Sequence, residues 1–159
     1  GLLYSSTEVN SQVQAEAVKE YCKANGLTVV EVTAPTVNDI PQAVKSLVGQ
    51  IDFLYLPTDN IMAAAIPNIT AITDPAGIPV FAGADEMVKA GCLGSRSVNY
   101  YEIGKEAGYM AVKILKKEAK PEDMAIPLQK DMKIVFNMEE AKRLNITIPE
   151  DILASAEKI

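Results

Sequence analysis

Hydrophobic and polar residues recur along the chain with two different periods, and the changes between these periods predict strands separated by helices. Short apolar runs, which are typical of strands, lie at 1–4, 27–32, 51–56, 78–82, 92–98 and 133–136. Apolar residues at helical spacing predict helices over 59–73, 99–118 and 138–144, and further helices that begin after Ser5–Thr7 and at Asn38 or Asp39. Strands that alternate with helices in this way are typical of βαβ units and of a mainly parallel sheet covered on both faces.

Individual residues predict where these helices begin, which face they bury and where they bend. Ser5, Ser6 and Thr7 offer side-chain oxygens for capping the first helix, and Asn25-Gly26 is expected to end it. The apolar residues of that helix share one face: Val9, Val13, Ala17 and Tyr21. The second helix is expected to bury Ile40, Val44 and Leu47. Pro67 is expected to kink or shorten the helix over 59–73, because proline removes a backbone donor.

Three polar segments follow apolar strands of the predicted sheet: 5–7, 58–60 and 83–86. In open α/β sheets, ligands bind beyond the carboxyl ends of the strands, so these segments are expected to share one ligand-binding edge, which we call the rim. Ser, Thr, Asp and Asn are also the preferred residues at helix starts, so each segment has a purely structural explanation as well. Both explanations remain open at this point.

The chemistry of the rim segments favours a ligand that carries both charges. Helix N-termini present free backbone N–H groups and a partial positive charge, which suit a carboxylate. The carboxylates of Asp59, Asp85 and Glu86 would suit an ammonium group. Donors and acids on one rim therefore favour a zwitterion such as an amino acid.

Composition excludes several other functions. The net charge of −6, without a basic cluster, argues against binding to nucleic acid, which depends on Lys and Arg. The chain of 159 residues contains no His, which removes the commonest general base and most zinc sites. Its apolar runs are shorter than the ~18 residues that a membrane span needs. Cys22 and Cys92 are expected to be small buried hydrophobic residues.

The sequence also lacks the motifs of nucleotide and phosphate chemistry. No dinucleotide-binding or Walker glycine pattern follows a strand. A phospho-acceptor receiver domain would need paired acids after its first strand, where Ser5 and Ser6 stand instead. We therefore expect no cofactor, no metal and no catalytic activity. Because the chain begins inside an apolar strand, at Gly1-Leu2-Leu3-Tyr4, we expect it to be a piece of a longer protein.

Several segments together carry a family likeness: LLYSSTEVNSQVQ (2–14), DFLYLPTDNIMAAA (52–65), IPVFAGADEMVKAGCLGSRSVNYYEIGKEAGYMAVKILKKEAKPEDM (78–124) and NITIPEDIL (145–153). In this order and spacing they resemble the substrate-binding proteins of ABC importers. The likeness is to the subgroup associated with aromatic amino acids such as tryptophan and tyrosine.

The resemblance implies one lobe of a type I periplasmic-binding-protein clamshell, an α/β, Rossmann-like three-layer sandwich with a mainly parallel sheet. Residues 1–98 would form the second lobe, 99–120 a helix that crosses to the absent first lobe, and 121–159 the return strand, a short helix and a tail. An extracytoplasmic location, in the periplasm or on a lipid anchor, and an ABC permease as partner are also implied.

The resemblance also implies roles for single residues. The residues expected to contact the ligand, by position, are Ser5, Ser6, Asn10, Thr58, Asp59, Asn60, Asp85 and Glu86. Asn99 and Tyr100 would lie at the hinge, about which the cleft would close. Without a first lobe to cover it, the helix over 99–118 leaves an apolar stripe open, formed by Ile103, Ala107, Met110 and Ile114. Self-association through this helix is therefore predicted.

Two other functions share this architecture. One is the effector-binding half of a sugar- or purine-responsive transcription repressor, and the other is an enzyme of flavodoxin-like fold. The sequence upstream would distinguish the first from an importer component, since a repressor would carry a helix-turn-helix head there and an importer component a lipid-attachment Cys.

Overall fold

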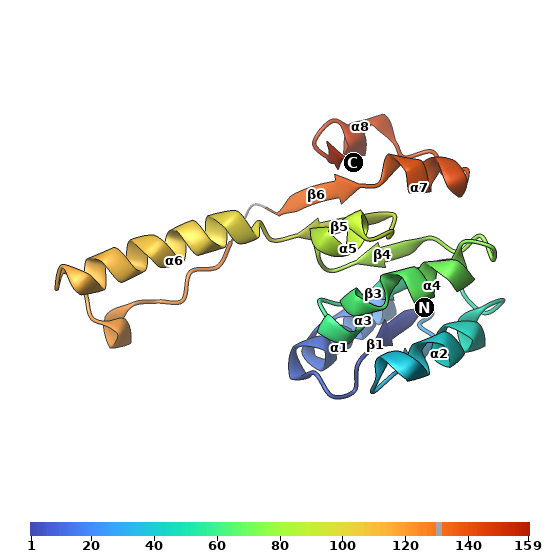
Figure 1. Cartoon of the computed structure of the whole chain (residues 1–159), viewed down its shortest axis with the longest axis horizontal. Helices are drawn as coiled ribbons and strands as arrows, with labels where there is room; N and C mark the ends of the chain where they lie inside the picture. The colour runs from blue at the N-terminus through green and yellow to red at the C-terminus, as the bar shows by residue number, and fades with distance from the viewer. Residues whose placement is uncertain (130–131) are drawn as a thin grey trace.

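A computed structural model of the chain describes residues 1–129 and 132–159, and shows a twisted sheet with helices packed against it (Figure 1). Residues 130 and 131, inside the segment 121–159 predicted above, lie outside the described residues. The strands are β1 (Leu2–Tyr4), β2 (Glu31–Thr33), β3 (Leu54–Leu56), β4 (Val80–Ala82), β5 (Gly94–Ser97), β6 (Lys133–Phe136) and β7 (Glu157–Lys158). The α-helices are α1 (Val9–Ala24), α2 (Ile40–Leu47), α3 (Asn60–Ala64), α4 (Ile66–Thr73), α5 (Asp85–Lys89), α6 (Tyr100–Leu115), α7 (Met138–Arg143) and α8 (Glu150–Leu153). Two 3-10 helices, η1 (Val37–Asp39) and η2 (Pro121–Asp123), complete the elements.

The strand order creates a topological switch point at the centre of the sheet. The order is β2-β1-β3-β4-β5-β6-β7, so the chain moves from β1 to one side and then crosses back to β3 on the other side. All neighbouring strands run parallel except β5 and β6, which pair antiparallel from Gly94↔Phe136 to Ser97↔Lys133. The predicted α/β class and mainly parallel sheet are confirmed.

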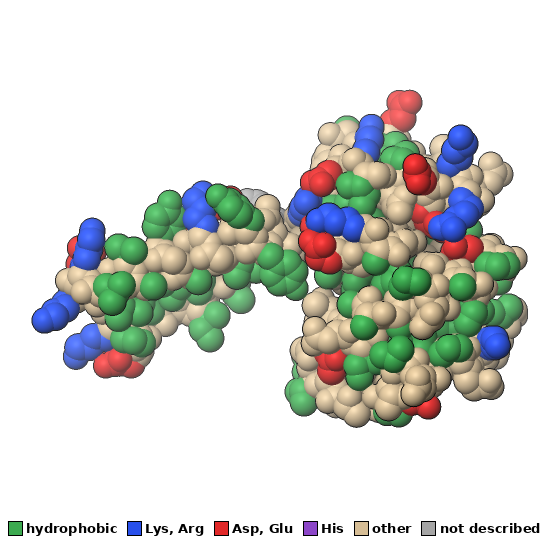
Figure 2. All heavy atoms as spheres, viewed as in Figure 1, with side chains coloured by type: hydrophobic (Ala, Val, Ile, Leu, Met, Phe, Trp, Pro, Cys, Tyr) green, Lys and Arg blue, Asp and Glu red, His purple; other side chains and the backbone are tan. Residues whose placement is uncertain are grey.

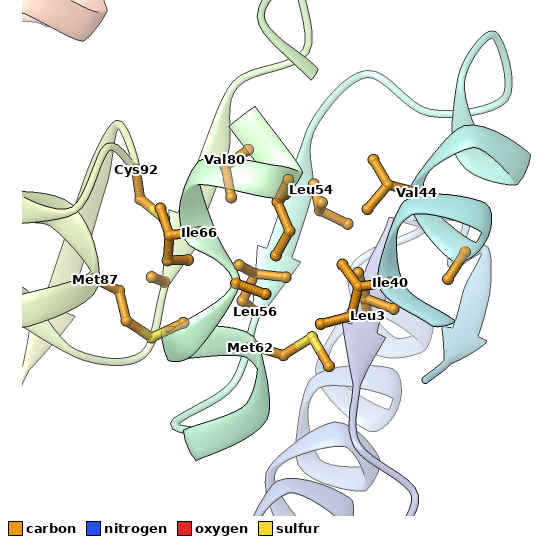
Figure 3. Packing of buried hydrophobic residues seen from close by; sticks show 14 of the residues in the cluster. Leu3, Ile40, Val44, Leu54, Leu56, Met62, Ile66, Val80, Met87 and Cys92 are labelled. Carbon is orange, nitrogen blue, oxygen red and sulfur yellow. The ribbon is translucent and has the colours of Figure 1, made fainter. Parts of the chain in front are cut away.

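One face of the sheet carries the main hydrophobic core. Leu3, Leu54 and Leu56 point from the central strands into this face and are fully buried. The second helix covers them with Ile40, Val44 and Leu47, as predicted, and α3 and α4 add Met62 and Ile66 (Figure 3). The predicted long helix over 59–73 is divided at Ala65 into α3 and α4, and Pro67 lies in the first turn of α4, where its missing N–H is not needed.

The opposite face is covered by α1 in a way that the sequence pattern did not predict. The buried residues of α1 are Ser11 and Ala15, and Ala15 packs against Leu2 and Tyr4. Three of the residues predicted to share an apolar face, Val9, Val13 and Tyr21, are 72%, 65% and 65% exposed. The helix packs closely through small side chains, so the larger apolar side chains point to solvent. Its N-cap is Glu8, whose side chain accepts from Asn60 and Ile61 and does not cap α1, while the predicted capping residues Ser5 and Thr7 bond to each other.

Smaller differences concern the ends of elements. The predicted strand over 27–32 is shifted, since β2 begins only at Glu31. The segment after α7, predicted only as a tail, contains α8 and the short strand β7, which extends the sheet beside β6. Both cysteines are free, and Cys92 is buried, while Cys22 is only half-buried. Burial raises the pKa of the Cys92 thiol to about 12, which keeps it protonated and inert.

Helix α6 leaves the body of the molecule as an arm (Figure 1). It follows β5 directly, and the chain returns through η2 to enter β6. None of the α6 residues, all of which the structure describes, is buried. Hydrophobic side chains are spread along this arm in the space-filling view (Figure 2).

Arg143 holds two carboxylates together at the surface over α4 and α7. Its Nη1 lies 2.7 Å from Oδ2 of Asp74, and its Nη2 contacts the carboxylate of Glu140, which is only 3% exposed. Burial raises the pKa of Asp74 above its ordinary value, and the Arg143 charge lowers it to a smaller extent. The guanidinium therefore offsets part of the cost of burying these acids.

We expect Arg143→Met to lower the free energy of unfolding at pH 7 by about 1–3 kcal/mol, because it leaves buried acids without a cation. This expected loss of stability is smaller than is usual for a broken buried ion pair, because the Arg143 side chain is 55% exposed. A carboxyl whose folded-state pKa is raised contributes most below its unfolded pKa, near 3.8, and this contribution is lost as the pH rises through the folded pKa. The deficit of the variant should therefore shrink from pH 7 toward pH 4.

Denaturant titrations at several pH values would measure this deficit. Lys142→Met is the matched control, because Lys142 is exposed and forms no ion pair among the described residues. A deficit for Arg143→Met that is independent of pH would show that the acids do not depend on this guanidinium.

Candidate ligand-binding site

Asp59 joins the loops that follow β1 and β3, the two strands at the switch point. Its side chain is 3% exposed, and Oδ2 accepts a hydrogen bond from the backbone N of Ser5 at 2.8 Å. Its other oxygen, Oδ1, accepts from the backbone N of Met62 at 2.9 Å and so caps α3. Asp59 thus connects the ends of both strands to the start of α3.

Thr58 is fixed by the first turns of α1. Its backbone N donates to Oε1 of Gln14 at 3.0 Å, and its carbonyl oxygen accepts from Nδ2 of Asn10 at 2.7 Å and from Oγ of Ser11 at 3.4 Å. The Thr58 hydroxyl donates to the carbonyl of Gly83 at 3.2 Å. A Cβ at Gly83 would lie 2.6 Å from the Thr58 nitrogen, so only glycine allows these two loops to approach so closely.

Glu8 connects the first rim segment to the start of α3. Its carboxylate accepts from the backbone N of Asn60 at 3.1 Å, from Nδ2 of Asn60 at 3.0 Å and from the backbone N of Ile61 at 3.2 Å. The backbone donors at the start of α3, which sequence reasoning assigned to a ligand carboxylate, therefore have a partner from within the chain.

The third rim segment, after β4, is held by an ion pair from β6. Asp85 is 9% exposed, and its Oδ2 lies 3.4 Å from Nζ of Lys133. Lys133 also pairs with Glu157 at 2.8 Å, and these carboxylates raise the pKa of the Lys133 ammonium, Glu157 having the larger effect. The neighbouring Glu86 is exposed and pairs with Lys89 at 2.9 Å.

Asn99, a predicted hinge residue, forms the junction between β5 and the arm. Its Oδ1 accepts from the backbone N of Tyr101 at 3.1 Å and of Glu102 at 3.3 Å, which caps α6. Its own backbone N donates to Oε1 of Gln129 at 2.6 Å, on the returning segment. Tyr100, the other predicted hinge residue, is 53% exposed at the first position of α6.

The predicted site residues thus fall into two groups. Ser6, Asn10, Asn60 and Glu86 are exposed on the rim, although Asn10, Asn60 and Glu86 also bond to Thr58, Glu8 and Lys89 respectively. The others, Ser5, Thr58, Asp59 and Asp85, are partly or fully buried and bond to other parts of the chain. The structure brings the segments after β1 and β3 into direct contact, and Thr58 connects both to the segment after β4.

Several rim residues were missed by sequence reasoning: Glu8, Ser11, Gln14 and Lys133. Glu8 follows Ser5 by three residues, which is the spacing of a capping box, and this pattern could have marked it. The other three act through contacts between segments far apart in the sequence, for which a single sequence gives no indication.

Within 1–129 and 132–159, no group of three or more His, Cys, Asp or Glu side chains is placed to hold a metal ion. No helix in that part of the chain is long and apolar enough to cross a membrane.

A rim of polar loops at the switch point of an α/β sheet is typical of the class of α/β proteins that bind a small ligand beyond their strand ends. The chain belongs to the family of ABC transporter substrate binding proteins, whose family model matches residues 1–159. The predicted family is confirmed, and the family is one of binding proteins rather than enzymes.

Named relatives and solved structures agree with this assignment. The chain is 32% identical to a tyrosine-binding protein of Clostridioides difficile over 92% of this chain and 42% of the relative. It is similar to the crystal structure of an ABC domain in complex with L-Trp from Streptococcus pneumonia, with a TM-score of 0.90 and 35% identity, over 99% of this chain and 53% of that one. A ligand-free, open substrate binding protein with adhesive properties from Clostridium difficile matches with a TM-score of 0.81 and 38% identity, over 100% of this chain and 53% of that one. The chain therefore spans about half the length of these relatives.

We expect Asp59→Ala to lower the free energy of unfolding by about 1–3 kcal/mol, because two backbone N–H groups would lose their acceptor in a buried place. Chemical denaturation monitored by circular dichroism would measure the loss. Asp52→Ala is the matched control, because Asp52 is exposed and forms no side-chain hydrogen bond among the described residues. Equal stability of the two variants would contradict a structural role for Asp59.

Proposed function

We propose that this chain is the second lobe of the extracytoplasmic solute-binding component of an ABC importer, in the periplasm or on a lipid anchor. In this proposal the rim binds a small zwitterionic ligand, an aromatic amino acid, in a cleft against the other lobe. An ABC permease is the partner that receives the ligand.

The geometry of the rim is the observation that supports this proposal. The exposed group of Ser6, Asn10, Asn60 and Glu86 offers hydroxyl, amide and carboxylate groups to one small solute. Donors of this kind can bind a ligand carboxylate, and Glu86 offers an acceptor for an ammonium group. The buried group holds the loops in place before the ligand arrives, which reduces the entropic cost of binding.

The choice of an aromatic amino acid follows from the relatives. One relative is named for tyrosine, and one solved structure holds L-Trp. Both are more than 30% identical to this chain over nearly its whole length. The family favours this function over the effector-binding half of a repressor.

In this proposal the arm would connect this lobe to the other lobe. Residues 99–120 would cross to the other lobe, and residues 121–159 would return to this one. Asn99 and Tyr100 would then lie at the hinge. Because only two residues separate the end of β5 from the start of α6, a change of backbone angles at this junction would move the arm relative to the rim.

We expect L-tyrosine or L-tryptophan to stabilise the protein against thermal unfolding, whereas glycine and glucose should not. The gain should follow mass action, at about 2.7 kcal/mol when the free ligand is a hundredfold above its Kd. Asn60→Ala and Glu86→Ala should each weaken binding by about 1–3 kcal/mol, the usual effect of losing a hydrogen bond to a charged group. Titration calorimetry on the parent and on both variants would measure these losses.

Asn38→Ala serves as the control, because Asn38 is an exposed asparagine on η1, outside the rim. If both rim variants bind as tightly as the parent and the control, the rim is not the binding site. If sugars stabilise the protein and amino acids do not, the ligand class is wrong although the site can still be right.

A further inference from the structure

Most backbone donors at positions 5–8, after β1, already have acceptors within the chain. The N–H group of Ser5 donates to Oδ2 of Asp59 at 2.8 Å, and that of Thr7 donates to Oγ of Ser5 at 3.2 Å. The N–H group of Glu8 reaches the carbonyl oxygen of Ser5 at 3.5 Å. A ligand carboxylate would therefore find few donors on this segment that are not already used.

The donors at the start of α3, after β3, are used in the same way. The N–H groups of Asn60 and Ile61 donate to the Glu8 carboxylate, at 3.1 Å and 3.2 Å. The N–H group of Met62, one residue further along, donates to Oδ1 of Asp59 at 2.9 Å. A ligand carboxylate at this helix start would have to displace a carboxylate that belongs to the chain itself.

The third rim segment, after β4, is itself acidic. Asp85 and Glu86 occupy the first turn of α5, and their charges disfavour another carboxylate beside them. Lysines of the chain already pair with both acids, since Lys133 lies 3.4 Å from Asp85 and Lys89 lies 2.9 Å from Glu86. The charges on this segment are therefore partly neutralised from within the chain.

Glu8 differs from the other acids of the rim in both its partners and its exposure. Its carboxylate is held by two backbone N–H groups and by Nδ2 of Asn60 at 3.0 Å, all of which are neutral donors, so its negative charge is fixed in place without being cancelled. The residue is only half-buried, whereas Asp59 is buried and uses both of its oxygens on backbone N–H groups. Glu8 is therefore suited to accept a hydrogen bond from a cation at the rim.

We infer that this lobe binds the ammonium end of the ligand, and that Glu8 is a specificity-determining residue that accepts a hydrogen bond from the ammonium group. The inference rests on the proposed function, because it assumes that the rim binds an amino acid. The ligand carboxylate then points away from the segments after β1 and β3, whose donors are engaged. Because Asn60 and Ile61 hold Glu8 in place before binding, little conformational freedom is lost when the contact forms.

This arrangement predicts which part of the ligand the protein recognises through Glu8. A ligand that keeps its ammonium group but lacks the carboxylate still makes the contact. A ligand that keeps only its carboxylate loses the contact and is repelled by the Glu8 charge. L-tyrosine, tyramine and hydroxyphenylpropionate form the matched set, because tyramine lacks the carboxylate of tyrosine and hydroxyphenylpropionate lacks its ammonium group.

The test compares the binding of these three compounds by the parent protein and by Glu8→Gln, using titration calorimetry and displacement titrations for the weaker ligands. Glu8→Gln should weaken the binding of L-tyrosine and of tyramine about tenfold or more, which corresponds to a lost hydrogen bond to a charged group. Hydroxyphenylpropionate should bind to Glu8→Gln as tightly as to the parent, or more tightly.

Two further variants serve as controls. Glu20→Gln makes the same change at an exposed glutamate on α1 and should bind all three compounds like the parent. Glu8→Asp keeps the charge on a shorter side chain and should recover part of the preference for L-tyrosine over hydroxyphenylpropionate. Circular dichroism melting would check that the variants are folded, and Glu8→Asp takes the place of Glu8→Gln if the latter is not.

Two results would overturn the inference and leave the proposed function intact. Equal weakening of all three compounds, or of none, would mean that Glu8 only holds α3 in place. Tighter binding of L-tyrosine by Glu8→Gln would mean that Glu8 competes with the ligand carboxylate for the donors at the start of α3. If the parent protein binds none of the three compounds, the proposed ligand class fails and this inference fails with it.

Discussion

Both faces of a parallel sheet must be covered, and most of this structure can be understood from that constraint. Leu3, Leu54 and Leu56 on one face are buried under α2, α3 and α4, and this packing forms the main core. On the other face α1 covers the strands at the switch point, while Phe81 and Phe136 belong to a further cluster that includes residues of α7 and α8. Helix α6, in contrast, buries none of its residues.

The strand order of this sheet also determines where the rim lies. Because β1 and β3 are neighbours whose connections leave in opposite directions, their carboxyl ends adjoin a gap with no crossing chain. Asp59 fills the base of that gap with a carboxylate that bonds only to backbone N–H groups. Its charge is therefore used to hold loops, and the amide groups of Asn10 and Asn60 also connect loops, since they donate to Thr58 and Glu8.

Sequence patterns were most successful where local physics decides the structure. The apolar runs located every strand of the sheet but β7, and the prediction for Ile40, Val44 and Leu47 was correct because α2 has an ordinary amphipathic face. The prediction for α1 failed because Ala15 and Ser11 allow a close approach to the sheet, and small residues carry little hydrophobic pattern. At the rim, the residue types were predicted but their partners were not. Which acid caps a helix and which one faces solvent depends on contacts such as Glu8 with Asn60, more than fifty residues apart.

The base of the arm and the third rim segment are connected through one lysine. Ser97 at the end of β5 is paired in register with Lys133 at the start of β6, so the arm leaves and returns at the same edge of the sheet as the ligand loops. Lys133 in turn pairs with Asp85, the first residue of α5 on the rim. Because Lys133 lies at the base of the arm and holds Asp85, the arm and the third rim segment are fixed to each other at this edge of the sheet.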